Sequence, residues 1–264
     1  MNNQLQEWLE QKKYAALDFI NPKLETCSQI AGNNAFAIDG FTTPGLGCHI
    51  LSIPHHGAQS GGDIHYVTVC GHRMKSKFVL IDARGHGEAA SKLSARLLGS
   101  MGRLASQPDN QSLLAEINAL IYNTDDIPAL ATAAAGTFND LDGTWTYAYA
   151  GLPNMLIRHN GLWSELHPDG DKSLPCGMMN DSGYYQTTTT LRLGDWVMMY
   201  SDGILSTVER HKAKHDAANL IELAASVDAE TTERFFHAFV ERLVEANQRA
   251  DFEDDLTLIL IERK

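Results

Sequence analysis

The sequence predicts an α+β fold in which two antiparallel sheets pack face to face and helices cover their outer faces. Helical patterns occur near the start, in the middle and near the end of the chain. The stretch between them consists of short β-prone runs separated by Gly, Asn, Asp and Pro. The closing run LTLILIE is apolar enough for a strand covered on both faces. A chain of 264 residues with 44% apolar content can bury such a core, so we expect a single domain over residues 1–264.

Five helices are expected from their apolar patterns and their end signals. The first ends at Asn21-Pro22, because the residue before a proline is disfavoured in the helical region. The third follows a capping signal at Asp109-Asn110, and Asp228 is the expected N-cap of the fifth. In the fifth helix, Phe235, Phe236 and Phe239 form an aromatic stripe that we expect in the core. The five expected ranges are 5–20, 88–105, 111–122, 216–225 and 228–247.

Strands are expected at about 48–54, 64–70 and 77–81, the last two forming a hairpin through GHRMKS. A meander of antiparallel strands should follow from the runs ATAAAGTFN, TWTYAYA, NMLIRHN, LWSELH, TTTTLRL and DWVMMYS. The charged stretch ERHKAKHD comes after this meander. We expect it to be a solvated flap, with docking of a partner as the alternative.

Charge and cysteine content argue against several classes of protein. Acidic residues outnumber basic ones by 33 to 21, and the net charge of −12 disfavours nucleic acid and anionic membrane surfaces as partners. The four cysteines are far apart and form no C-x-x-C pair, so we expect reduced thiols. No stretch resembles a signal peptide or approaches the roughly 20 apolar residues that cross a bilayer. A cytoplasmic protein is therefore expected.

Four short stretches place an aspartate beside glycine or another acid. They are Asp63 in SGGDIHY, Asp82 in IDARGHG, Asp202 in MMYSDGI and Asp254 in FEDDLT. Three of them touch an apolar run, so these carboxylates should lie where a strand meets a turn. Any one alone would be an ordinary turn residue. Carboxylates repel one another, however, so a group of four is tolerable only with cations between them, and hard ions such as Mg²⁺ or Mn²⁺ suit these oxygens.

The four motifs together resemble a known family. In order and spacing, GGD, D-x-x-G-H-G, S-D-G and D-D-x-T are similar to those of the PPM-type serine/threonine protein phosphatases, and most closely to the bacterial SpoIIE/RsbU-like branch, which regulates sigma factors. YAYAGLPNMLIRHNG is similar to that branch's AGHPP hairpin, and LRLGDWVMMYSDGI to its L-x-x-GD…TDG strand. The matching region is 61–264, with a weaker match through an N-terminal helix at 1–22.

The resemblance implies a four-layer αββα sandwich with a centre of two Mn²⁺ or Mg²⁺ ions at one end of the sheets. Asp82 would bridge both ions, and Asp202 and Asp254 would complete the shell of the first. Asp63 and the backbone carbonyl of Ala83 would hold the second. Two such ions can share and activate a water, so no Ser, Cys or His nucleophile is needed.

Two pairs of neighbouring residues each leave a choice. Asp254 and Asp255 compete for one ligand position, and the family pattern favours Asp254, with Asp255 as a supporting or turn-forming acid. His55 and His56 precede the GGD motif and could be read as a pair of metal ligands. Adjacent residues on an extended chain point to opposite faces, so we favour exposed loop residues there.

The turn after Asp82 holds two further candidates. His86 is a candidate general acid for the leaving oxygen, and the alternative is that it only steadies the turn. Arg84 is a candidate clamp for the substrate phosphate, and the alternative is a salt bridge to a surface acid. Gly85 and Gly87 should let the backbone turn tightly beside the metals.

The expected activity is that of a metal-dependent phosphoserine/phosphothreonine protein phosphatase. By resemblance alone, its substrate would be a phosphorylated regulator of the anti-anti-sigma (STAS-domain) kind, and regulation would come from an activating protein partner. Tyr66, Leu152 and Ser206 replace an acid, a His and a Glu of the branch pattern. These departures keep a degenerate, non-catalytic binding protein as the alternative, and a metal hydrolase of small phosphate esters is a third.

Overall fold

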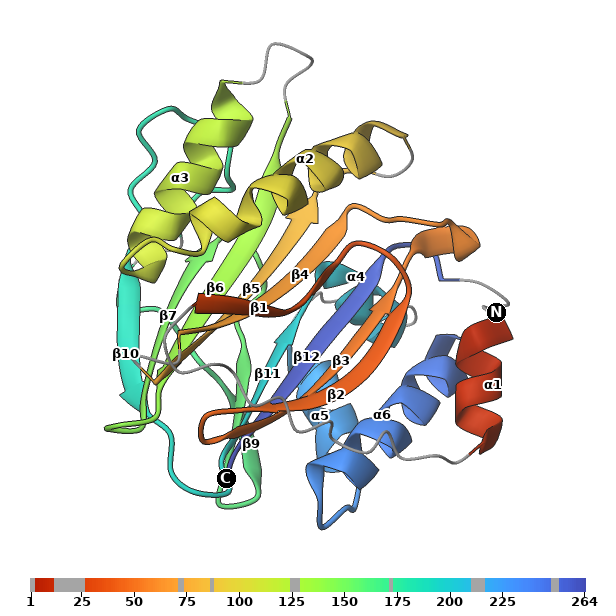
Figure 1. The fold of residues 1–264 in the computed structure, drawn as a ribbon. Coiled ribbons are helices and arrows are strands. Elements are labelled where there is room, and N and C mark those ends of the chain that lie inside the picture. The colour runs from red at the N-terminus through yellow and green to blue at the C-terminus, as the bar shows by residue number, and fades with distance from the viewer. Residues whose placement is uncertain are drawn as a thin grey trace.

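The computed structural model describes residues 3–11, 27–70, 74–85, 88–123, 129–170, 173–209, 217–247 and 252–264. Two six-stranded sheets pack face to face, and helices lie on both outer faces (Figure 1). Neighbouring strands in both sheets are antiparallel. The predicted four-layer α+β sandwich is confirmed.

The first sheet lies beneath two helices, α2 (Glu88–Leu104) and α3 (Asn110–Tyr122). Side chains along one of its strands alternate between the two sides. Phe78 and Leu80 face the other sheet, whereas Val79 and Ile81 face the helices. The strand order is β1 (Cys27–Asn33), β4 (Asp63–Cys70), β5 (Lys75–Ala83), β6 (Ala131–Asn139), β7 (Thr144–Ala150) and β10 (Gln186–Thr190).

The second sheet is covered by α4 (Asp202–Glu209), α5 (Ala218–Ala225), α6 (Thr232–Asn247) and α1 (Asn3–Gln11). Phe235, Phe236 and Phe239 of α6 are buried against this sheet, so the predicted aromatic stripe is core. Leu5 of α1 is buried in the same cluster. The strand order is β2 (Ala37–Thr43), β3 (Leu46–Ile53), β12 (Leu256–Arg263), β11 (Trp196–Tyr200), β8 (Leu156–His159) and β9 (Leu162–Glu165).

The ends of the helices test the capping predictions. Asp109 caps α3 as predicted, because its side chain accepts a hydrogen bond of 2.7 Å from the amide of Ser112. The prediction of Asp228 as N-cap of the last helix is wrong. That helix begins at Thr232, and the hydroxyl of Thr231 accepts from the amide of Arg234 at 3.3 Å. The structure also contains β1, β2 and α4, which were not predicted.

Some predictions fall outside the described residues. These are the second half of the helix expected at 5–20, most of the charged flap, and both His86 and Gly87. The thiols of Cys48, Cys70 and Cys176 are free, as expected. Within the described ranges, no helix is long and apolar enough to span a membrane.

Candidate metal centre

The topology brings the four predicted aspartates to one end of the space between the sheets. Asp63 begins β4 and lies opposite Asp82 of β5 in the antiparallel register. Asp202 follows β11 as the first residue of α4, and Asp254 lies in the turn that leads into β12. Because β11 and β12 are antiparallel neighbours, the last residues of β11 and the first residues of β12 lie at the same end of the sheet. Each sheet therefore contributes two carboxylates.

Asp63 is the most deeply placed of the four, with only 3% of its surface exposed. The hydroxyl groups of Ser201 and Thr257, from the second sheet, lie near its side chain and favour its charged form. Its oxygen Oδ2 is buried and finds no hydrogen-bond partner among the described residues. Burial, followed by the charge of Asp82, raises the pKa of Asp63 well above its ordinary value.

The other three carboxylates line one pocket and affect one another's titration. Burial raises the pKa of Asp82 to about 7, with further contributions from Asp202 and Asp254. The Asp202 side chain is partly exposed at the mouth, and its pKa is raised by desolvation in the cleft and then by Asp254. Thr132, opposite Asp82 in the register of β6, donates to Asp82 Oδ2 at 3.4 Å. Mutual repulsion thus disfavours full ionisation of this group.

The pocket has a volume of about 390 Å³ and two chemically different sides. The three carboxylates and Glu253 form the acidic side. Arg84 and Gly85 lie beside them, and Gly85 has the positive φ of 92° that suits glycine, as the predicted tight turn requires. The remaining lining is mainly apolar and comprises Leu130, Ala131, Pro175 and Met178, together with Thr132.

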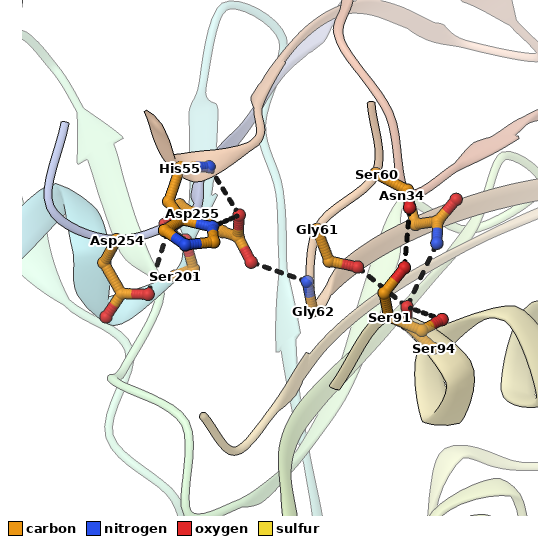
Figure 2. A network of polar contacts seen from close by, with 10 residues as sticks. All are labelled: Asn34, His55, Ser60, Gly61, Gly62, Ser91, Ser94, Ser201, Asp254 and Asp255. Carbon is orange, nitrogen blue, oxygen red and sulfur yellow. Dashed lines mark hydrogen bonds and ion pairs between the residues drawn. The ribbon is translucent and has the colours of Figure 1, made fainter. Parts of the chain in front are cut away.

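Asp255 has a different role from its neighbour Asp254. It is 5% exposed, and its two oxygens accept from two backbone amides of the loop between β3 and β4. Oδ1 accepts from His55 at 2.7 Å and Oδ2 from Gly62 at 2.6 Å. Figure 2 shows the two carboxylates pointing in different directions from one turn. Asp255 therefore anchors the loop that carries Asp63, while Asp254 faces the pocket.

The same loop is held from the side of the helices. Ser94 of α2 donates to the carbonyl of Gly61 at 2.8 Å, and Ser60 and Ser91 share a hydrogen bond of 2.6 Å (Figure 2). The carbonyl of Gly62 accepts from the amide of Ala83 at 3.3 Å, which brings this loop against the end of β5. The loop before Asp63 is thus tied to both sheets and to α2.

A close approach explains the glycine of the S-D-G motif. A Cβ atom at Gly203 would lie 2.1 Å from the carbonyl oxygen of Asp255 and 3.4 Å from the Cβ of Asp254. The first turn of α4 therefore packs directly on the turn before β12. This contact places Asp202 and Asp254 side by side.

These donors fit a hard divalent cation. They are oxygens only, one of them is a buried carboxylate oxygen without a hydrogen-bond partner among the described residues, and three carboxylates have raised pKa values. In the described part of the chain, no group of three or more His, Cys, Asp or Glu side chains lies close enough together to hold a metal ion as it stands. Cation binding in this pocket and the assignment of individual ligands are therefore proposals.

The remaining predicted residues differ in how they relate to the site. Arg84 is exposed at the pocket and forms no ion pair with another described residue. His56 is exposed as predicted, but the prediction for His55 is wrong, because its ring is 14% exposed and lies 3.7 Å from Asp255. His86 lies outside the described residues. Thr132 was not predicted, since a threonine in a small-residue strand carries no signal before the strand pairing is known.

Comparison with known proteins identifies the family. The family model described as Stage II sporulation protein E (SpoIIE) matches residues 73–264. The chain belongs to the SpoIIE family. The predicted resemblance to the SpoIIE/RsbU-like branch of PPM-type phosphatases is thereby confirmed, and the matched region contains Asp82, Asp202 and Asp254. No curated protein matches the sequence.

Solved structures share the fold of this SpoIIE-family chain. The RsbU and RsbW domains of Rv1364c from Mycobacterium tuberculosis match with a TM-score of 0.72 and 21% identity, over 88% of this chain and 63% of that one. The PP2C phosphatase domain of SpoIIE from Bacillus subtilis, with a fragment of its regulatory domain, matches with a TM-score of 0.71 and 18% identity, over 82% of this chain and 63% of that one. RsbX in complex with magnesium matches with a TM-score of 0.63 and 17% identity, over 86% of this chain and 100% of that one. The chain thus spans 63% of the length of each of the first two structures.

The raised pKa of Asp82 predicts how the stability of this SpoIIE-family chain depends on pH when metal is removed. Between the ordinary value of 3.8 and about 7, the unfolded chain has released this proton while the folded chain retains it. The free energy of unfolding should therefore fall as pH rises through that window and level off above it. Urea unfolding in EDTA at several pH values measures this. Asp82→Asn should flatten the fall, whereas the exposed control Asp228→Asn should not, and parallel curves for wild type and Asp82→Asn would contradict the assignment.

The anchoring role of Asp255 predicts a difference between two adjacent substitutions. Asp255→Asn replaces one acceptor oxygen by an NH₂ donor, so the amide of His55 or Gly62 would face a donor in a buried site. We expect a loss of about 1–3 kcal/mol in the free energy of unfolding without metal. Asp254→Asn should cost far less, because it relieves repulsion in the pocket. Urea unfolding of both variants in EDTA checks this, and equal stabilities would refute the anchor.

Proposed function

We propose that the chain is a metal-dependent phosphatase that hydrolyses phosphoserine and phosphothreonine in proteins. The observation that carries this proposal is the convergence of Asp63 and Asp82 from one sheet with Asp202 and Asp254 from the other. Arg84 stands at the mouth of the same pocket. Membership of the SpoIIE family and the fold of PP2C phosphatase domains support the same activity.

In this proposal, the carboxylates would hold two Mn²⁺ or Mg²⁺ ions. Asp82 would serve both ions, Asp202 and Asp254 would complete the ligands of one, and Asp63 with the carbonyl of Ala83 would hold the other. When bound, such ions supply an activated water and offset the charge of the phosphate. The magnesium in the related RsbX structure agrees with a hard cation.

The protein's own residues would position the carboxylates and neutralise the charge of the substrate phosphate. Thr132 orients Asp82 through its hydroxyl, and Asp255 fixes the loop of Asp63 through two amides. The exposed guanidinium of Arg84, which lines the pocket, would bind phosphate oxygens. We keep His86 as the candidate acid for the leaving oxygen.

The substrate we propose is a phosphorylated regulator of the STAS-domain kind, with an activating protein as a further partner. The similar structures include RsbU and RsbW domains, and another similar structure comes from work on the bacterial stressosome. Such a role places the reaction in the cytoplasm, without nucleic acid or membrane as partner.

The departures from the branch pattern argue little for a degenerate, non-catalytic protein. Tyr66 is buried with the side chains beneath α2, on the opposite face of β4 from Asp63. Leu152 is buried in the core between the sheets, and Ser206 is exposed on α4. None of the three residues lines the pocket. The acidic side of the pocket keeps its carboxylates, so turnover is the better proposal.

Metal-dependent turnover tests the proposed function. Wild type should hydrolyse p-nitrophenyl phosphate and a phosphoserine peptide with Mn²⁺, and EDTA should abolish both reactions. Asp82→Asn should lower kcat at least about a hundredfold, since the bridging charge is lost. The surface variant Asp228→Asn should match wild type. Activity that survives EDTA, or that is unchanged in Asp82→Asn, would overturn the mechanism, and full metal binding without hydrolysis would favour the degenerate alternative.

A further inference from the structure

Exposed apolar side chains gather beside the candidate metal centre. Eight large apolar side chains are exposed among the described residues, and four of them belong to the segment between β9 and β10. We call these four the apolar rim: Leu174, Met178, Met179 and Tyr185. Scattered exposed apolar residues are ordinary on a protein surface, but a local group of them marks an interaction site.

The apolar rim is continuous with the pocket. Met178 belongs to both, and Pro175, next to Leu174, also lines the cavity. The carboxylates Asp82, Asp202 and Asp254 line the same cavity. A ligand whose phosphate reached the carboxylates would therefore extend directly onto the rim.

The rim segment is held firmly against the fold. The buried side chain of Asn118 on α3 donates to the carbonyls of Met179 and Asn180, both at 3.0 Å, and accepts from the amide of Gly177 at 2.7 Å. Cys176 exchanges two backbone hydrogen bonds with Ala131, of 3.0 and 2.8 Å. Ala131 adjoins Thr132, the residue that contacts Asp82. The segment that carries the exposed side chains is thus held at a fixed position relative to the carboxylates, and its backbone runs beside α3 (Figure 1).

We propose that the apolar rim docks the substrate protein by binding apolar side chains that border its phosphoserine or phosphothreonine. This inference rests on the proposed function and adds the chemistry by which the substrate is selected. A small phosphate ester needs only the pocket, whereas a protein that inserts a phosphorylated side chain must lay its surface on the mouth. Two methionines suit that contact, because their flexible thioethers adapt to an apolar partner. Burial of Met179 and Tyr185, now 55% and 61% exposed, supplies the attraction.

The test uses two phosphoserine peptides of equal length, one with Leu, Val and Phe around the phosphoserine and one with Ser and Gly. The rim variant is Met179→Ser with Tyr185→Ser, neither of which lines the pocket. The matched control is Leu141→Ser with Leu193→Ser, two side chains 77% and 74% exposed near the far ends of the strands. All three proteins should hydrolyse p-nitrophenyl phosphate with Mn²⁺ at equal rates and unfold at the same urea concentration.

Wild type and control should show a kcat/KM for the apolar peptide about tenfold above that for the polar one, and the rim variant should lose this preference. A rim variant that keeps the full preference, or a wild type without any, overturns the inference. Should no phosphate ester be hydrolysed, the proposed function fails. The preference for the apolar peptide is then measured as binding, by fluorescence anisotropy of the same peptides with the same three proteins. A wild-type dimer that becomes a monomer in the rim variant, with the preference unchanged, would assign the rim to a second copy of the chain and overturn the inference.

Discussion

Carboxylates that meet at the end of an apolar core repel one another, and the surrounding structure depends on how that repulsion is balanced. Asp63 and Asp82 lie opposite each other on neighbouring strands, and Asp202 and Asp254 approach from the other sheet. Burial and mutual charge raise the pKa values of Asp63, Asp82 and Asp202. Such a group is stable only with protons or cations in place. Under the proposed function, metal binding and folding stability are therefore coupled at this end of the sandwich.

The four carboxylates of the candidate metal centre are positioned by contacts that other residues make. Asp255 anchors the loop before β4 through two backbone amides, and Ser94 of α2 anchors the same loop through a carbonyl. The close packing of Gly203 on the turn before β12 sets the distance between α4 and that turn. These contacts remain when the ligand charges change. The site is consequently preorganised by buried hydrogen bonds and by packing, and the four carboxylates remain available for the proposed cations.

The sequence predicted the parts of this fold that depend on long apolar patterns. Strands β5, β11 and β12 and helices α2 and α3 were foreseen, because their periodicity is strong. The edge strand β1 was missed, since CSQIAGN is polar and its pairing is interrupted between Gln29 and Ala31. Helix α4 starts inside the motif that carries Asp202, where a turn was the simpler expectation. Two adjacent aspartates have identical side chains, so only the family pattern favoured Asp254 as the ligand, and the structure is needed to show that Asp255 accepts from two loop amides. The apolar rim lies in a loop whose apolar residues have no regular spacing, so no sequence pattern predicted it.

The location of bound manganese tests the central claim most directly. Crystals of the wild-type chain grown in Mn²⁺ should show two anomalous peaks about 3.5–4 Å apart. Asp82 should lie between them, with Asp202 and Asp254 on one peak and Asp63 with the Ala83 carbonyl near the other. Manganese found only elsewhere, or the four carboxylates far apart with no ion among them, would contradict the account.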